Sequence, residues 1–137
     1  MKKSSMIILV FAFAVTLVCM LSACGKTEST GDIVLPSADK VSKVEIKKGD
    51  AEPAITDDAE VIANLLKEMA TAKDTGKESV SDRPLGDTAV EIIFEVTEGE
   101  DNTVFMYFSK GALLLEQPYQ GIYSVDKSVA DIVNNIK

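Results

Sequence analysis

The chain has 137 residues, a formal net charge of −8 and no histidine. The absence of histidine excludes Ser-His-Asp and Cys-His catalysis and HExxH-type zinc sites, and it removes the most common general base. The acidic balance argues against a nucleic-acid partner, because phosphate binding needs clustered lysine and arginine. We expect no metal and no other cofactor.

Residues 1–23 predict a lipoprotein signal peptide. Lys2 and Lys3 form a positive start, and Met6–Leu21 is an almost wholly apolar run of sixteen residues. That run is shorter than the roughly 20 residues that a transmembrane helix needs, and it ends in small residues as a secretory signal does. The cleavage motif is Leu21, Ser22 and Ala23. Cys24 follows in a pattern similar to the bacterial lipobox, so we expect it to carry the lipid; the alternative is an uncleaved membrane anchor with a chance cysteine.

Lipidation at Cys24 would anchor the protein on the extracytoplasmic face of the cell membrane. Two or three acyl chains hold a protein firmly, because each buried methylene contributes about 0.8 kcal/mol. Cys19 leaves with the signal peptide, so the mature chain has no disulfide. Removal of the signal also changes the formal charge to −10, which disfavours docking on anionic headgroups. Residues 24–34 are small and polar and predict a flexible tether, and residues 35–137 predict a single domain.

The first half of that domain predicts a strand and a helix. Val41–Lys48 alternates apolar with charged residues, as a half-buried strand does. Thr56–Ala72 predicts a helix that is capped by Thr56 or Asp57. Its apolar stripe consists of Ile62, Leu65, Leu66 and Met69. The acidic residues at its start suit the helix dipole, and a cation site is the alternative.

The second half predicts four strands and a helix after a polar connection over Lys73–Asp87, in which Ser79–Ser81 is expected to form a short edge strand. The four strands are expected at Thr88–Thr97, Thr103–Ser109, Ala112–Glu116 and Ile122–Val125. The acidic stretch Glu98–Asn102 predicts a solvated turn, because its spacing does not match an EF-hand loop; a calcium site is the alternative. Asp126 or Ser128 begins the terminal helix.

The expected element order is therefore β-α-β-β-β-β-α. Runs of strands with segregated helices indicate the α+β class. We expect an antiparallel sheet of about four to five strands with both helices packed on its apolar face.

The stretch Gln117–Gly121 interrupts the strand pattern and carries the candidate binding residues. Pro118 and the glycine fix a tight corner, and tyrosine rings suit a surface that is partly wet and partly packed. The candidates are Gln117, Tyr119, Gln120 and Tyr123, together with the only arginine, Arg83. The alternatives are structural: the tyrosines brace the last helix, and Arg83 pairs with Asp82 or Asp87 at the surface.

Three segments carry a family resemblance: Glu116–Tyr123, Leu35–Ser37 and Ser79–Pro84. Together they resemble a family of small extracytoplasmic domains of unknown function from Gram-positive bacteria, whose members look like stand-alone lipoproteins. Similar segments form the outer domain of membrane metallopeptidase regulators that resemble beta-lactam sensors. The resemblance implies no established activity, and a sensing or binding role is an analogy with those neighbours.

Three functional hypotheses follow. We favour a non-enzymatic binding or sensing domain of unknown ligand, because the chain offers an anchor, a tether and no catalytic constellation. The second is a carboxylate-based cell-wall hydrolase, for which Glu91 and Glu95 would have to lie about 5–10 Å apart. The third is a structural or inhibitory partner protein that pairs through its sheet edge or its tyrosine corner.

Overall fold

The computed structural model describes residues 31–80, 82–83 and 88–137. The predicted signal peptide, the lipobox with Cys24 and most of the predicted tether lie outside these residues. Within the described ranges, no helix is long and apolar enough to cross a membrane.

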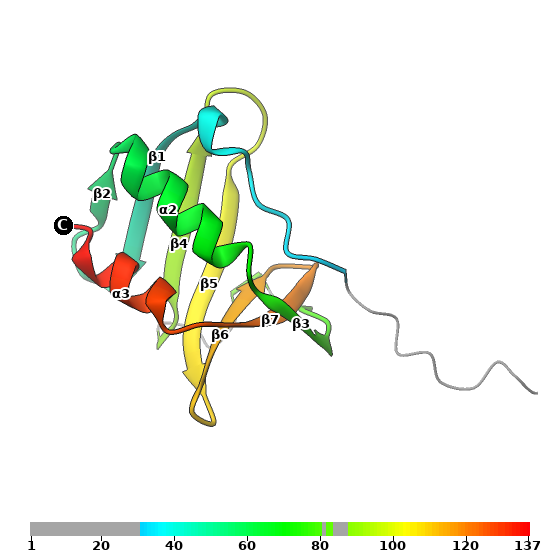
Figure 1. Cartoon of the computed structure of the whole chain (residues 1–137). Helices are drawn as coiled ribbons and strands as arrows, with labels where there is room; N and C mark the ends of the chain where they lie inside the picture. The colour runs from blue at the N-terminus through cyan, green and yellow to red at the C-terminus, as the bar shows by residue number, and fades with distance from the viewer. Residues whose placement is uncertain (1–30, 81, 84–87) are drawn as a thin grey trace, which may run out of the picture.

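Within the described residues, seven antiparallel strands form one sheet in the order β2-β1-β4-β5-β6-β7-β3 (Figure 1). The strands are β1 (Val41–Lys48), β2 (Ala54–Thr56), β3 (Lys73–Lys77), β4 (Val90–Val96), β5 (Asn102–Ser109), β6 (Ala112–Gln117) and β7 (Gly121–Val125). The α+β class is therefore confirmed. The expected count of four to five strands and the expected order β-α-β-β-β-β-α are wrong, because β2 precedes α2 and β3 follows it, and the sequence pattern predicts neither edge strand.

Both α-helices lie on the same face of the sheet (Figure 1), as their apolar stripes predict. They are α2 (Ala59–Met69) and α3 (Ser128–Asn135), and a short 3₁₀-helix, η1 (Ala38–Lys40), precedes β1. Ile62, Leu65 and Met69 of α2 and Val129 and Val133 of α3 are buried. They pack with alternate residues of the central strands into one apolar core.

The two missed strands are short and lack an apolar alternation. β2 has three residues, the last of which, Thr56, falls in the range expected for the helix, while β3 has the polar sequence Lys-Asp-Thr-Gly-Lys inside the expected connection. Each lies at an edge and is held by backbone pairing to one neighbour, β2 to β1 and β3 to β7. Backbone hydrogen bonds do not depend on side-chain pattern, so hydrophobic periodicity gave no signal for them.

The first helix begins later than its sequence pattern suggests. Asp58, and neither Thr56 nor Asp57, is its N-cap: Asp58 Oδ1 accepts the N–H groups of Glu60 at 2.8 Å and Val61 at 3.2 Å. Thr56 instead ends β2, and its hydroxyl accepts the N–H of Asp58 at 3.3 Å. The cap moves because pairing of β2 with β1 keeps the chain extended through Thr56.

The face of the sheet away from the helices is partly covered as well. Phe105 on β5 and Glu116 on β6 lie opposite each other on this face, and both are buried. Ser79 is also buried and contacts Glu116, so the segment after β3 reaches this face. Ser79 and Val80 are not in the expected edge strand, and Ser81 lies outside the described residues. The covered far face explains why the apolar pattern of β5 and β6 is continuous.

Candidate functional site

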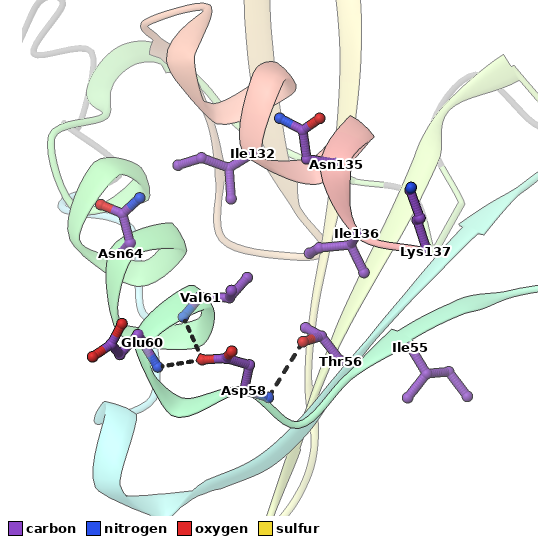
Figure 2. A pocket seen from close by; sticks show the side chains of 10 residues that line it. All are labelled: Ile55, Thr56, Asp58, Glu60, Val61, Asn64, Ile132, Asn135, Ile136 and Lys137. Carbon is purple, nitrogen blue, oxygen red and sulfur yellow. Dashed lines mark hydrogen bonds between the residues drawn. The ribbon is translucent and has the colours of Figure 1, made fainter.

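An open groove of about 550 Å³ lies between β2, the start of α2 and the end of α3 (Figure 2). It is lined by Ile55, Thr56, Asp58, Glu60, Val61, Asn64, Ile132, Asn135, Ile136 and Lys137. This volume lies within the range of about 300–1,000 Å³ that is typical of ligand sites. The groove brings the end of α3 together with β2 and the start of α2, which are consecutive in the sequence and far from α3 along the chain.

The apolar part of the groove comes from the edges of the two helix stripes and from β2. Val61 and Ile132 are only half-buried, whereas Ile62 and Val133 beside them in the sequence lie in the core. Ile55 faces away from the core and is 49% exposed. The groove therefore offers aliphatic surface, and none of its lining residues is aromatic.

The polar part of the groove contains an acidic end and two amides. The Asp58 carboxylate holds the first turn of α2 through the two N–H groups given above, and Glu60 is exposed beside it. Asn64 on α2 and Asn135 on α3 are exposed and supply donors and acceptors. This mixture of aliphatic surface with a few polar groups suits binding, and it contains no pair of nucleophile and base.

The predicted corner at Gln117–Gly121 is a tight turn between β6 and β7. Gln120 donates its N–H to the carbonyl of Gln117 at 3.0 Å, and Tyr119 has a positive φ of 59°. Such a φ is unfavourable for a residue with a Cβ, so the surrounding structure holds Tyr119 in place. Its side chain is 65% exposed, and its hydroxyl donates to Asp82 at 2.5 Å, which raises the pKa of Tyr119.

The two tyrosines do not form one surface. Tyr123 lies opposite Leu115 on the core face of the sheet and is fully buried, so it is a core residue and not an accessible binding residue. Gln120 is exposed at the turn beside Tyr119. Tyr123 belongs to β7, whereas Tyr119 lies in the turn before that strand with a positive φ, so strand alternation does not place the two rings on one face.

Gln117 is predicted as a binding residue, but in the structure its side chain makes a structural contact. Its side chain is 5% exposed and clasps the backbone of Val34: Nε2 donates to the carbonyl at 2.7 Å, and Oε1 accepts the N–H at 2.9 Å. Asn102 donates to the same carbonyl at 3.0 Å. Ile33 packs against the core beside this clasp, so two residues of the expected tether contact the domain.

Arg83 lies near Glu91, and its sequence neighbour Asp82 accepts the hydroxyl of Tyr119. Arg83 Nη2 is 3.7 Å from Glu91 Oε2, a carboxylate that the sequence does not predict as its partner. Asp87 lies outside the described residues. Glu95, the other carboxylate of the hydrolase hypothesis, is 2.9 Å from the Lys43 ammonium. Both glutamates therefore face lysine or arginine on the sheet face away from the helices.

Glu116 is a buried carboxylate outside the set of predicted binding residues. It is 6% exposed, and it accepts hydrogen bonds from Ser79 Oγ at 2.7 Å and from Tyr107 Oη at 2.8 Å. Burial, together with this hydrogen bond to the carboxylate, raises the pKa of Tyr107. The signal was present in the sequence: a glutamate ends the apolar run Leu113–Leu115, where period-two alternation places it on the covered far face.

The acidic turns do not form a metal centre in the described part of the chain. No group of three or more acidic or cysteine side chains there is placed to hold a metal ion. In the Glu98–Asn102 stretch, Asp101 Oδ1 accepts the N–H of Val96 at 3.1 Å, and Asn102 begins β5. At the start of α2, the carboxylate of the N-cap residue Asp58 accepts a hydrogen bond from the backbone N–H of Glu60.

Comparison with known proteins assigns most of the domain, including the corner, to a family, and the matched region covers only part of the groove. The model of the family DUF5301, described as "Domain of unknown function (DUF5300)", matches residues 29–124. The chain belongs to this family. The match includes the corner and ends before α3, which supplies part of the groove.

A solved relative has the same fold. The NMR structure of a protein from Ruminococcus gnavus is 34% identical to this chain with a TM-score of 0.63, over 74% of this chain and 99% of that chain. No curated protein matches the chain at a significant level.

Proposed function

We propose that the chain is an exported lipoprotein whose folded domain binds an extended peptide and catalyses no reaction. The observation that carries the proposal is the groove beside β2, which combines aliphatic surface, polar groups and an edge strand (Figure 2). Peptide binding by strand addition uses these three features and needs no titratable catalytic group.

The edge strand indicates how a peptide would lie. Within the described residues, β2 is the first strand of the sheet and pairs with β1 alone. An extended peptide can add to such an edge through backbone hydrogen bonds, which provide affinity without sequence preference. Alternate side chains of the added strand would then reach the aliphatic surface of Val61 and Ile132, and a peptide lysine would suit the acidic end at Asp58 and Glu60.

The anchor is supported by the sequence before the domain. The positive start, the short apolar run and the Leu-Ser-Ala-Cys motif agree in position and order, and the acidic net charge of the chain disfavours docking on anionic headgroups without a lipid. The resemblance to the outer domains of beta-lactam-sensor-like regulators supports a sensing or binding role on the extracytoplasmic face. We therefore propose that Cys24 carries the lipid and that the groove binds the ligand.

The groove is tested with an amide-capped peptide of alternating valine and threonine with a lysine at each end. We expect NMR shift changes of amide groups in β2, the first turn of α2 and α3 of the 31–137 domain. Asn64→Trp should abolish them, because residue 64 lines the groove. Ala63→Trp is the matched control: it is the neighbouring exposed position of α2 and does not line the groove. Shift changes confined to the β3 edge, or equal binding by both variants, would contradict the proposal.

The anchor is tested by replacing Cys24 with alanine in the full chain. Metabolic labelling with a fatty acid should then give no labelled protein, and processing should stop or the protein should leave the membrane fraction. Cys19→Ala is the control, because that cysteine is removed with the predicted signal. Equal label in Cys24→Ala and in the unchanged protein contradicts the lipobox.

A further inference from the structure

The chain enters the described domain beside the Tyr119 corner. Gly31 is the first described residue, and three residues later Val34 is clasped by Gln117 at the end of β6. Figure 1 shows this entry point close to the turn between β6 and β7. It shows β2 and the C-terminus near the opposite edge of the sheet. The corner and the groove are therefore at different ends of the domain.

Three exposed apolar side chains surround the corner. Val34 is 55% exposed, Val80 is 81% exposed and Tyr119 is 65% exposed. Gln117 fixes the backbone of Val34, and the Tyr119 hydroxyl holds Asp82, two residues after Val80. Of the five large hydrophobic residues that are exposed in the described part of the chain, these three lie around one turn, while Ile55 and Phe108 lie elsewhere.

We propose that this surface, Val34, Val80 and Tyr119, rests on the bilayer that carries the lipid anchor, so that the groove points away from the membrane. The inference relies on the proposed lipidation of Cys24. Six residues lie between Cys24 and Gly31, and the seven residue-to-residue steps, at about 3.5 Å each, allow at most about 25 Å between the lipid and the domain. The end of the domain that the tether reaches first is the corner.

The chemistry of the surface fits a bilayer interface. A tyrosine ring places an apolar body in the acyl boundary and a hydroxyl among the headgroups, and two valines add aliphatic area. The contact needs little affinity of its own, because the anchor makes it intramolecular. The acidic charge of the domain opposes anionic headgroups, so the contact is apolar and is best formed on zwitterionic lipid.

The test uses the absence of tryptophan from the chain. Tyr119→Trp and Ile55→Trp each introduce one tryptophan at an exposed apolar position, one at the corner and one in the groove. Four or more strand spacings of about 4.8 Å separate these positions across the sheet. Each variant is prepared as the full, lipid-modified protein in vesicles of brominated phosphatidylcholine, and mass spectrometry verifies the lipid.

We expect the bromine to quench tryptophan emission at position 119 and to leave emission at position 55 unchanged. Adding Val34→Asp and Val80→Asp to Tyr119→Trp should remove the quenching, and the Val34 clasp should persist because Gln117 contacts only backbone atoms there. Phe108→Asp, at another exposed apolar position, is the matched control and should leave the quenching intact.

Several results would overturn the orientation. They are absence of quenching at 119, quenching at 55, or a shift of emission at 119 that requires added membrane proteins instead of lipid. If mass spectrometry finds no lipid on Cys24, the proposed anchor fails first and this inference fails with it. Peptide binding in the groove is measured separately and is affected by neither result.

Discussion

Asp58 fixes the first turn of α2, and its effect can be separated from that of its neighbour. Its carboxylate accepts two backbone N–H groups, whereas Asp57 is an exposed acid that lies one residue earlier. We expect Asp58→Ala to lower the free energy of unfolding by about 1 kcal/mol, because loss of an N-cap costs about 0.5–2 kcal/mol. Asp57→Ala should have a clearly smaller effect. Equal losses in urea denaturation of the two variants would show that the cap is misassigned.

Tyr107 should make the domain sensitive to alkaline pH. Burial and the bond to Glu116 raise its pKa in the folded state, so the folded domain retains a proton that the unfolded chain loses above about pH 10. Stability from this group is complete below that pH and decreases as pH rises. We expect the free energy of unfolding to fall more steeply above about pH 10 in the unchanged domain than in Tyr107→Phe. Parallel curves for the two proteins would contradict this assignment.

At the scale of elements, β6 joins the core, the far face and the N-terminal segment. Leu113 and Leu115 point into the core, Glu116 points to the far face, and Gln117 clasps Val34. Strand alternation allows one strand to serve both faces of the sheet. The entry segment is therefore part of the folded domain and not only a connection to the anchor.

Removal of that segment should destabilise the domain. A chain that begins at Pro36 lacks Ile33 and Leu35, which pack against the core, and leaves the Gln117 amide without Val34. Relative to a chain that begins at Gly31, we expect a loss of about 2–4 kcal/mol in denaturant unfolding. Gln117→Leu should cost less in the shorter chain than in the longer one, because its partner is already gone. Additive effects would argue against the clasp.

At the scale of the whole molecule, residues 31–137 should unfold in one cooperative transition. The described helices share one core with the sheet, and domains of this size are usually two-state. Reductant should not change the midpoint, since both cysteines precede residue 31. Different midpoints by far-ultraviolet circular dichroism and by tyrosine fluorescence would indicate independent parts.

We also expect the purified domain to hydrolyse neither peptidoglycan nor peptides. A carboxylate hydrolase needs one acid whose pKa is raised in an apolar pocket. Glu91 and Glu95 instead lie beside Arg83 and Lys43 on the sheet face opposite the helices. Release of soluble fragments from cell wall, measured with the unchanged domain and with Glu91→Gln and Glu95→Gln, should stay at background. Turnover that either substitution abolishes would favour the hydrolase hypothesis.

The sequence alone determined the elements that bury a regular apolar pattern. The apolar stripe of α2, the α+β class and the four strands from β4 to β7 are confirmed, because periods of 3.6 and 2 residues reflect which side chains are buried. The lipobox at Cys24 stays a prediction. Of the candidate binding residues, only Tyr119 and Gln120 are exposed at the corner.

Only the tertiary structure decided what depends on partners distant in the chain. β2 and β3 exist because β1 and β7 pair with their backbones, and the register of β7 against β6 places Tyr123 in the core while Tyr119 remains outside. The groove likewise needs Val61 and Ile132 to meet beside β2. Local sequence patterns indicate whether a side chain is buried or exposed to water. They do not indicate which distant backbone or side chain it contacts.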